Sequence, residues 1–360
     1  MDVCKYFFIF VHPIFNISEM SNKTEITIHD LAKKLNISAS TVSRALNDNP
    51  RISQKTRDKI KAAALELGYQ PNTIASNLRN RKSNTIGIVV PLINRHFFSS
   101  VISGVEDVAF AAGYNVVISQ SNDEGEKEQR IVRSMFANRV DGLIISIAMK
   151  TTQYDHLQLF SGKKIPLVFF DRIVKEIESD RVVVDDFSGG YKVTRHLIEQ
   201  GCKRIAHLTG PLNLQTYYDR KSGYMQALRD NGQQIEEELI VVNNLTRADG
   251  LAAIKQLLSL EKRPDGIFCG NDTTALSAIL HLRETGVKVP DEIAIVGYSN
   301  EPFSEVVTPS ISTIKQPGFE MGQKAAQMII RQIENKEKPE KFETIIMPNE
   351  LVIRESSLKK

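Results

Sequence analysis

The sequence predicts an all-α head followed by an α/β core whose two subdomains each contain a doubly wound parallel sheet. Before residue 70, apolar residues recur three and four residues apart, which is typical of amphipathic helices. From residue 85 onward, apolar runs of strand length alternate with segments of helical periodicity, as in buried parallel sheets. The alternation restarts near residue 204, and a chain of 360 residues that is 41% hydrophobic can fill two such halves.

The head begins with two short helices joined by a tight turn between residues 27 and 47. Thr27 is placed to cap the first helix, with Asp30 in its first turn, and Ser38 is placed to cap the second. Ile37 lies in the turn, where it closes the space between the helices. The apolar positions that are expected to face each other are Leu31, Ala32, Leu35, Val42, Ala45 and Leu46.

The remaining positions of the second helix are small or form hydrogen bonds. A helix that enters the major groove of DNA needs this composition, because short polar side chains reach base edges and phosphates without holding the helix away. A helical hairpin with a solvated polar face is the alternative interpretation of the same residues. These positions are Ala39, Ser40, Thr41, Ser43 and Arg44.

A third helix and a short connecting segment follow. Ser53 is placed to cap a helix over residues 54–67, and Gly68 ends it in the left-handed conformation that glycine favours. After Pro71, residues 73–79 are too few for a stable isolated helix, so this segment is expected to fold only when it is docked. The apolar face of the third helix consists of Ile60, Ala63, Ala64 and Leu67.

Five ordered blocks make this region resemble the N-terminus of the lactose/galactose-repressor (LacI/GalR) family of transcription factors. They lie at residues 27–32, 41–47, 53–60, 67–72 and 75–78. The resemblance implies that Leu78 of the hinge segment enters the minor groove at the centre of an operator and kinks it. Packing of Leu78 on its own domain is the alternative. The DNA contacts that the resemblance implies are Thr27, Ser38, Ala39, Ser40, Thr41, Ser43, Arg44, Asn47, Ser53, Thr56, Tyr69, Asn72, Ala75 and Leu78.

The distribution of charge agrees with a nucleic-acid partner for the head. Residues 23–84 carry twelve Lys and Arg but five Asp and Glu, which gives a formal charge of +7. The whole chain carries +3, so the remainder carries −4. A basic head on a mildly acidic body is typical of a protein that contacts phosphates.

The composition disfavours several other classes of function. The three cysteines, Cys4, Cys202 and Cys269, are too far apart for a disulfide framework or a zinc cluster, and indicate a reducing cytoplasm. The seven histidines form no ligand pair, and the sequence has no phosphate-binding loop or nucleophile elbow. No apolar run reaches the roughly 18 residues of a membrane span. We therefore expect no catalytic residues, no metal site, no cofactor and no membrane partner.

Residues 1–22 are expected to be an extension ahead of the head. Residues 6–11 have the composition of an export-signal core, but His12 and Pro13 interrupt them and no small-residue cleavage site follows. Met20 stands directly before the first helix, which indicates that translation starts there and that residues 1–19 are not native. A genuine apolar arm is one alternative. A periplasmic sugar-binding protein with an export signal is another, although the head has no purpose in it.

The core is expected to alternate strands and helices in each half. The first half has strands at residues 85–91, 114–119, 142–147, 166–171 and 181–184, and helices at 98–112 and 126–138. The second has strands at 204–210, 240–242, 266–269 and 293–298, and helices at 220–231, 250–260 and 272–285. Residues 313–335 then cross back to the first half, and residues 342–354 return to the second. The expected domains are a head (23–70), a hinge and linker (71–84), a first subdomain (85–183 and 313–340) and a second (184–312 and 341–358).

The candidate effector residues lie near the ends of strands, because ligands of doubly wound sheets bind at the carboxyl ends of the strands. Asp accepts hydrogen bonds from paired hydroxyl groups and Arg donates in a fork, so such residues in an apolar cleft suit a polyhydroxylated ligand. The family resemblance supplies the two aspartates and Arg220, and the family's likeness to periplasmic sugar-binding proteins supplies Phe98 and Arg172. A helix cap is the alternative role for Asp272, and packing is the alternative for Phe97. The candidates are Phe97, Phe98, Asp171, Arg172, Arg220 and Asp272.

Three places near the cleft depart from the family pattern. After the first strand, where an Asn-Pro-Phe sequence is expected, the basic pair Arg95 and His96 replaces the proline. Residues 299–301, Ser-Asn-Glu, replace an Asp-Asp pair, and Tyr217 and Tyr218 replace smaller or charged residues. These changes alter the hydrogen bonds that a ligand meets, so its identity cannot be transferred from a relative.

Together these features predict an effector-responsive transcriptional regulator, as the resemblance implies. We expect a cytoplasmic homodimer, nucleoid-associated when bound to DNA, that represses carbohydrate-utilisation genes at a near-palindromic double-stranded operator. A small sugar-like effector in the cleft is expected to change the angle between the subdomains and so the spacing of the hinges. An enzyme on the same doubly wound fold is the least favoured class, because no catalytic pair is apparent.

Overall fold

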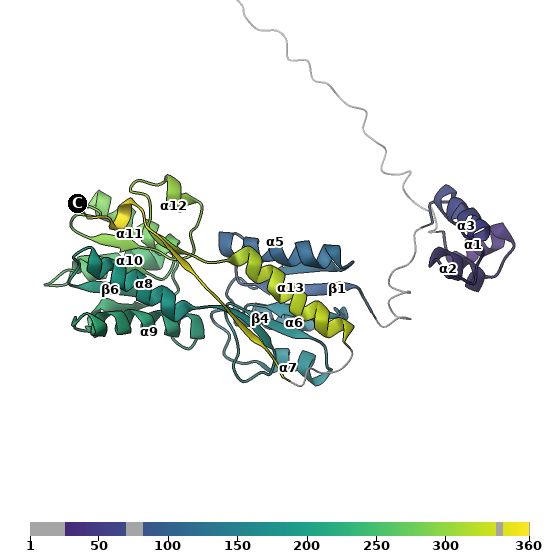
Figure 1. The fold of residues 1–360 in the computed structure, drawn as a ribbon, viewed down its shortest axis with the longest axis horizontal. Helices are drawn as coiled ribbons and strands as arrows, with labels where there is room; N and C mark the ends of the chain where they lie inside the picture. Colours follow the sequence, from purple (N-terminus) through teal and green to yellow (C-terminus); the bar gives the residue numbers. More distant parts are fainter. Residues whose placement is uncertain (1–25, 70–81, 336–340, 360) are drawn as a thin grey trace, which may run out of the picture. The chain divides into compact units, whose positions relative to one another are not determined.

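The computed structural model describes residues 26–69, 82–335 and 341–359. The chain divides into two units, Met1–Arg81 with the head and Lys82–Lys360 with the core (Figure 1). The helices of the head are α1 (Ile28–Leu35), α2 (Ala39–Leu46) and α3 (Gln54–Glu66). The predicted hinge segment at residues 73–79 and the N-terminal extension lie outside the described residues.

Each head helix begins at the cap that the sequence predicts. Thr27 and Asp30 form a capping box, because the Thr27 backbone N–H donates to the Asp30 carboxylate at 2.8 Å and the Thr27 hydroxyl accepts from the Asp30 backbone N–H at 3.3 Å. Ser38 caps α2 and Ser53 caps α3 through their side-chain oxygens. Gly68 follows α3 at φ +66°, the left-handed conformation predicted for it.

A small hydrophobic core holds the three helices together. Leu31 and Val42 are completely buried, and Ile37 packs against them from the turn. Leu35 and Leu46 contact this core but are only partly buried. Because the core is so small, each large side chain carries a large share of its stability. Its buried members are Leu31, Ala32, Val42, Ala45, Ile60, Ala63 and Ala64.

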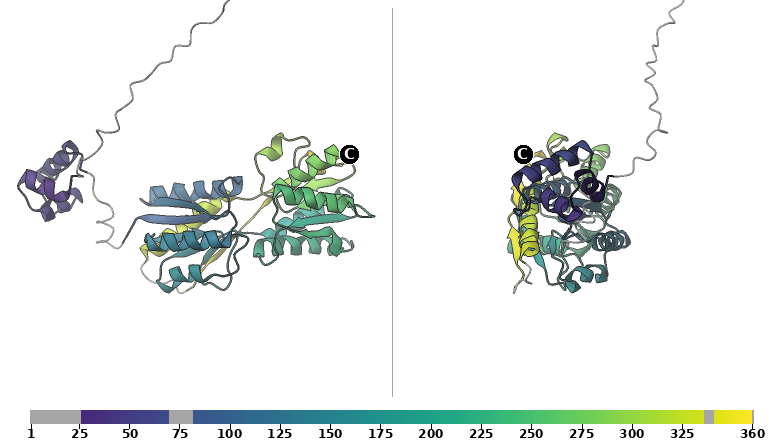
Figure 2. Two further views of the ribbon diagram at one scale, coloured as in Figure 1. Left: turned by 180° about the vertical axis from the view of Figure 1, so that it is seen from behind. Right: turned by 90° about the vertical axis from the view of Figure 1, so that its right-hand side faces the viewer.

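The first subdomain of the core contains a six-stranded parallel sheet in the order β11-β5-β4-β3-β1-β2. Helices α5 and α13 cover one face of this sheet, and α6 and α7 cover the other (Figures 1 and 2). The strands are β1 (Thr85–Val90), β2 (Asn115–Gln120), β3 (Gly142–Ile145), β4 (Leu167–Phe170), β5 (Asp180–Val184) and β11 (Thr344–Met347). The helices are α5 (His96–Ala111), α6 (Gly125–Ala137), α7 (Asp155–Gly162) and α13 (Gly318–Glu334).

The second subdomain contains a four-stranded parallel sheet in the order β7-β6-β8-β9. Helices α8 and α9 pack on one face, and α10 and α11 pack on the other. The strands are β6 (Ile205–Thr209), β7 (Ile240–Val242), β8 (Gly266–Cys269) and β9 (Ala294–Val296). The helices are α8 (Asp186–Glu199), α9 (Gln215–Asp230), α10 (Arg247–Leu258), α11 (Asp272–Glu284) and α12 (Phe303–Val306), with 3-10 turns at Glu237–Leu239 and Glu355–Ser357.

Two short strands form the antiparallel connection between the subdomains. β10 (Thr313–Lys315) leads from the second subdomain to α13, and β12 (Glu350–Val352) pairs with it on the return path (Figure 1). The predicted return of residues 341–358 to the second subdomain is therefore wrong for its first part, because Thr344–Met347 still pair with β5. This edge strand packs Ile345 and Met347 against the core of the first subdomain before the chain crosses.

Four helices of the core, α7, α8, α12 and α13, are absent from the sequence prediction, and α9 begins at Gln215 rather than at residue 220. The α8 segment contains Gly189 and Gly190, which are poor helix formers. Tertiary packing requires them, because a Cβ on Gly190 would lie 2.1 Å from the carbonyl oxygen of Arg220 in α9. Within the described ranges, no helix has both the length and the apolar composition that crossing a membrane requires.

Candidate effector cavity and DNA-binding surface

A cavity of about 310 Å³ lies between the two subdomains of the core. All six effector residues predicted from the sequence line it: Phe97, Phe98, Asp171, Arg172, Arg220 and Asp272. They come from the carboxyl ends of strands and the helices that follow them, as expected for ligand sites of parallel sheets. Further lining residues that the sequence prediction missed include Asp123, Met149, Thr216, Tyr298 and Gln316.

Asp171 follows β4 with a backbone φ of 56°, a left-handed conformation that is uncommon outside glycine. Its neighbours hold this geometry, since its backbone N–H donates to the Val182 carbonyl at 3.0 Å and its carbonyl accepts from the Thr216 hydroxyl at 3.2 Å. One carboxylate oxygen accepts from the Ser146 hydroxyl at 3.4 Å. Burial raises the pKa of Asp171 to about 6, although the nearby Arg172 guanidinium opposes this shift.

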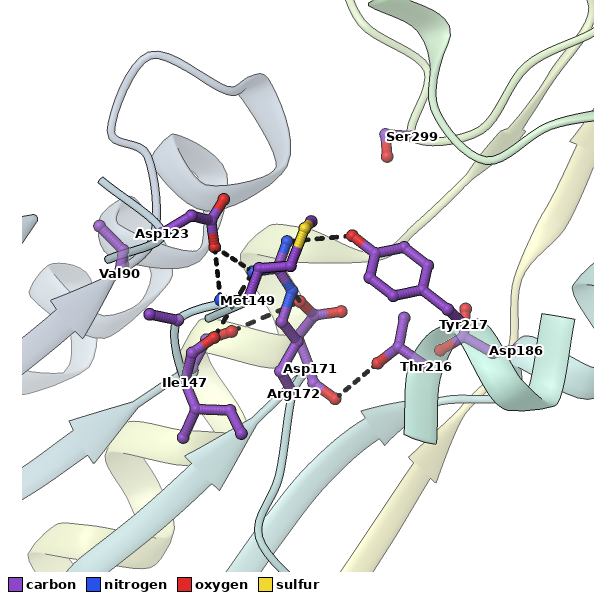
Figure 3. Close-up of polar contacts among 12 residues, drawn as sticks. Val90, Asp123, Ile147, Met149, Asp171, Arg172, Asp186, Thr216, Tyr217 and Ser299 are labelled. Carbon is purple, nitrogen blue, oxygen red and sulfur yellow. Dashed lines mark hydrogen bonds and ion pairs between the residues drawn. The ribbon is translucent and has the colours of Figure 1, made fainter. Parts of the chain in front are cut away.

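Arg172 lies beside Asp171 and is fully engaged by the protein (Figure 3). Its guanidinium donates to the Asp123 carboxylate, and to the Tyr217 hydroxyl at 3.1 Å. The rings of Phe98 and Tyr217 lie 5.9 and 5.7 Å from the guanidinium carbon. The buried charge of Arg172 is therefore balanced within the protein, by Asp123 and by aromatic faces.

Arg220 of α9 forms an equivalent cluster in the second subdomain. Its guanidinium donates to Asp186 at 2.8 Å and to the Gly270 carbonyl at 3.0 Å. The ring of Tyr298 lies 3.6 Å from the guanidinium carbon, and the Tyr298 hydroxyl donates to the same Asp186 oxygen at 2.8 Å. Burial raises the pKa of Asp186, and the Arg220 charge opposes this shift.

Asp272 is not the cap of α11, so the alternative role that the sequence left open is wrong. Asn271 caps this helix by accepting from the Thr274 backbone N–H at 2.8 Å. The Asp272 carboxylate instead accepts from the Thr313 hydroxyl at 2.7 Å, from the Glu301 backbone N–H and from the Ser304 hydroxyl of α12. Burial raises its pKa to about 7, while these hydrogen bonds oppose the shift. A Cβ at Gly297 would lie 2.1 Å from this carboxylate, so only glycine fits there.

The aromatic side of the cavity is formed by Phe97 and Phe98 at the start of α5. Their ring centroids lie 5.2 Å apart in an edge-to-face arrangement, and both side chains belong to the core of the first subdomain. The packing role left open for Phe97 is therefore observed, and the same residue also lines the cavity.

Four of the residues that depart from the family pattern form contacts between the subdomains: Arg95, His96, Tyr217 and Glu301. The Arg95 side chain donates to the Thr273 hydroxyl, and the His96 backbone N–H donates to the Glu301 carboxylate at 3.2 Å. Tyr217 accepts from Arg172 across the same gap. These four residues therefore lie where the two subdomains face each other across the cavity.

Gln316, which the sequence prediction missed, has a buried side-chain amide that is only partly hydrogen-bonded. Its side-chain oxygen accepts from the Ser299 hydroxyl at 3.0 Å, while its buried amide nitrogen has no hydrogen-bond partner among the described residues. It follows β10 in the connecting segment, where a search at the ends of the main-sheet strands does not look. Asp123 follows β2, and the same search applied to that strand would have found it.

The polar residues predicted to contact DNA are at the surface of the head where the structure describes them. Arg44 and Ser40 on α2 are exposed, and Arg44 has no ion-pair partner within residues 26–69. Asn47 and Thr27 are exposed too, although Thr27 also serves as a cap. Ala39, Thr41, Ser43, Thr56 and Tyr69 are half-buried, and Ser38 and Ser53 are exposed caps. The other three, Asn72, Ala75 and Leu78, lie outside the described residues.

No group of three or more His, Cys, Asp or Glu side chains in the described ranges is arranged to hold a metal ion. Cys202 and Cys269 are free and buried. Burial raises the pKa of the Cys202 thiol to about 11, which makes it a weak nucleophile.

Comparison with known proteins covers both units of the chain. The model described as "Bacterial regulatory proteins, lacI family" matches residues 27–72, and that described as "Periplasmic binding protein-like domain" matches residues 194–357. The HTH-type transcriptional repressor PurR of Vibrio atlanticus (strain LGP32) is 31% identical over 311 residues, covering 86% of this chain and 93% of PurR. The solved lac repressor dimer bound to operator and the anti-inducer ONPF has a TM-score of 0.81 at 27% identity, covering 93% of this chain and 100% of that one. The transcriptional regulator CelR–cellobiose complex has a TM-score of 0.70 at 27% identity, covering 92% and 100%.

Proposed function

The chain belongs to the lacI family of bacterial regulatory proteins. From this premise we propose that a small, uncharged, sugar-like effector binds the core cavity and controls the affinity of the protein for DNA. It is a DNA-binding transcriptional repressor with an effector-binding core, and it acts on operator DNA as a dimer. The regulated genes are those of carbohydrate utilisation. The protein works in the cytoplasm, on the nucleoid when it is bound, and it is not an enzyme.

The α2 helix of the head enters the major groove of the operator. Its exposed side chains, Ser40 and Arg44, are short or cationic, and Arg44 is not neutralised by a neighbour within residues 26–69. Residues 26–69 carry eight Lys and Arg but four Asp and Glu. Two of these acids are already paired, Glu66 with Lys34 and Asp48 with Lys61. The exposed cations without an acidic partner in the described head, such as Arg44, are therefore available to the phosphate backbone.

The chemistry of the effector follows from the ion pairs that the buried charges of the cavity already form with each other. Arg172 is paired with Asp123 and Arg220 with Asp186, so neither guanidinium is left for an anionic ligand. Among the buried polar groups of the lining, the second carboxylate oxygen of Asp171 accepts no hydrogen bond from a described residue, and the amide nitrogen of Gln316 is unpartnered. A neutral polyol supplies donors to the first and an acceptor to the second. Its apolar face fits the rings that line the cavity.

This internal matching of buried charges is the observation that carries the proposal. A phosphorylated or carboxylated sugar would need an unpaired cation, whereas the two fully buried cations, Arg172 and Arg220, are both paired with carboxylates. The half-buried Arg95 also lines the cavity, and its side chain donates to the Thr273 hydroxyl. A periplasmic sugar-binding protein accounts for the core alone and leaves three capped, basic head helices without a role. It is therefore not favoured.

The test uses the full-length chain and two binding measurements. Selection from a pool of random DNA duplexes is expected to converge on a near-palindromic site. Neutral sugars and their phosphorylated forms are then titrated against the complex, and a neutral sugar is expected to change operator affinity by about 5- to 150-fold. The proposal is overturned if selection yields no common sequence, or if only phosphorylated sugars change the affinity.

A further inference from the structure

Tyr217 lines the cavity and contacts both subdomains, although it belongs to the second. It lies in the first turn of α9 in the second subdomain and is 5% exposed. Its hydroxyl reaches the guanidinium of Arg172 in the first subdomain, and Figure 3 shows the ring directed toward Arg172 and Met149. The ring also belongs to a hydrophobic cluster that contains Met149 and Leu245. Tyr217 thus spans the gap between the subdomains.

The ring of Tyr217 is fixed from several sides. A Cβ on Gly210, which follows β6, would lie 2.5 to 2.7 Å from three of its ring carbons, so the ring lies directly against the chain there. The guanidinium carbons of Arg172 and Arg220 lie 5.7 and 5.5 Å from the ring centroid. Because these groups are themselves held by ion pairs, the ring cannot turn aside without breaking buried contacts.

We propose that Tyr217 is a specificity-determining residue that restricts the cavity to a single sugar ring and excludes disaccharides. This inference rests on the proposed function, since it concerns the size of the same effector. The cavity of about 310 Å³ is at the lower end of the range for small-molecule sites, about 300 to 1,000 Å³. The phenol of Tyr217, a six-membered ring with one hydroxyl, fills the space beside Arg172 and uses one of its hydrogen-bond donors, so neither is open to a second sugar ring.

Four variants of the full-length chain separate the parts of this role. Tyr217→Ala removes the ring and the hydroxyl, whereas Tyr217→Phe removes only the hydroxyl. Tyr217→Leu keeps apolar contact with Met149 but frees much of the ring's space, and it decides the question if Tyr217→Ala does not fold. Tyr218→Ala is the matched control, because Tyr218 is the next residue of α9 but is 55% exposed.

Binding of neutral sugars is measured by calorimetry, with ribose, glucose and galactose as single rings and with cellobiose and lactose as disaccharides. The wild type and Tyr218→Ala are expected to bind a single-ring sugar and no disaccharide. Tyr217→Ala or Tyr217→Leu is expected to improve disaccharide affinity by about tenfold or more. Tyr217→Phe is expected to keep the exclusion, because the ring remains.

Two outcomes would contradict only the inference about Tyr217, and a third would also contradict the proposed function. Wild-type protein that binds disaccharides as well as single rings overturns the inference and leaves the proposed function standing. So does a folded Tyr217→Ala or Tyr217→Leu variant that keeps single-ring binding without gaining disaccharides. Absence of sugar binding by the wild type and every variant overturns the proposed function, and the inference with it.

Discussion

The head and the core place their polar side chains in opposite environments. In the head, the carboxylates of Asp30 and Asp48 are exposed, and hydrogen bonds with Thr27 and Lys61 lower their pKa values. In the core, Asp171 and Asp272 are buried, and burial raises their pKa values. The difference indicates two modes of recognition. The head uses surface charge that salt screens, and the core uses short-range hydrogen bonds between buried groups of its cavity. A change within one unit should therefore leave ligand binding by the other unit intact when that binding is measured alone.

Leu31→Ala in the core of the head is expected to have the largest effect on operator binding relative to its effect on effector binding. Leu31 is completely buried, and its truncation is expected to cost about 2–5 kcal/mol, which a three-helix head cannot tolerate. Specific operator binding should be lost while effector affinity is unchanged, as measured by DNA-binding and calorimetric titrations. Leu65→Ala is the control, because Leu65 of α3 is 86% exposed. Loss of effector binding in the Leu31 variant would mean that the core needs a folded head in order to bind its effector.

The response to pH is expected to have opposite signs in the two units. A raised folded-state pKa gives stability that is present below the unfolded pKa and is lost as pH rises through the folded pKa. For Asp171 this window runs from 3.8 to about 6, and for Asp272 from 3.8 to about 7. The contribution of Asp171 to the pH-dependent free energy of unfolding is on the order of 3 kcal/mol. The lowered pKa values of Asp30 and Asp48 instead remove stability from the head below pH 3.8, as these groups become protonated.

Urea unfolding of wild type and Asp171→Asn at several pH values measures the core contribution. The wild-type core is expected to lose stability as pH rises through this window, and the variant is expected to lose less. Parallel pH profiles for the two proteins would show that Asp171 does not titrate within the window.

Arg44→Ala is expected to have an intermediate effect that is confined to DNA. Loss of one base or phosphate contact should weaken operator binding by about 1–3 kcal/mol, and effector affinity should not change. Lys163→Ala provides the charge-matched control, because Lys163 is an exposed cation of the core. Equal weakening by both substitutions would mean that overall charge, and not the α2 surface, determines the affinity.

The smallest effect is expected from Arg95→Ala, which removes a contact between the subdomains. The Arg95 hydrogen bond to Thr273 is a single partly exposed interaction, so its loss should change effector affinity by about 0.5–1.5 kcal/mol. Calorimetric titration of the full-length chain detects such a change. If operator affinity changes and effector affinity does not, the Arg95 contact between the subdomains does not contribute to effector binding.

Short-range features of this molecule could be predicted from the sequence with accuracy. The caps Thr27, Ser38 and Ser53 depend on residues three positions away, and strands such as β7 and β8 are uninterrupted apolar runs. The ends of the parallel strands led to six residues that meet at one cavity.

Features that depend on packing between distant segments could not be predicted. α8 contains two glycines that only the neighbouring α9 explains, and β11 stays in the first sheet because of contacts with α13 and β5. Asp272 had a helix cap as its alternative role, but Asn271 took that role and left Asp272 bonded to Thr313. Gln316 is far from every predicted strand end and reaches the cavity only through the path of the crossing segment.

Reciprocal linkage on the full-length protein is the most direct test of the claim that the cavity controls the head. Operator affinity is measured with and without a saturating sugar, and affinity for that sugar is measured with and without saturating operator. The account predicts that both affinities change by the same factor, between about 5- and 150-fold. If each ligand binds equally well whether or not the other is present, the cavity and the head are uncoupled and the account is contradicted.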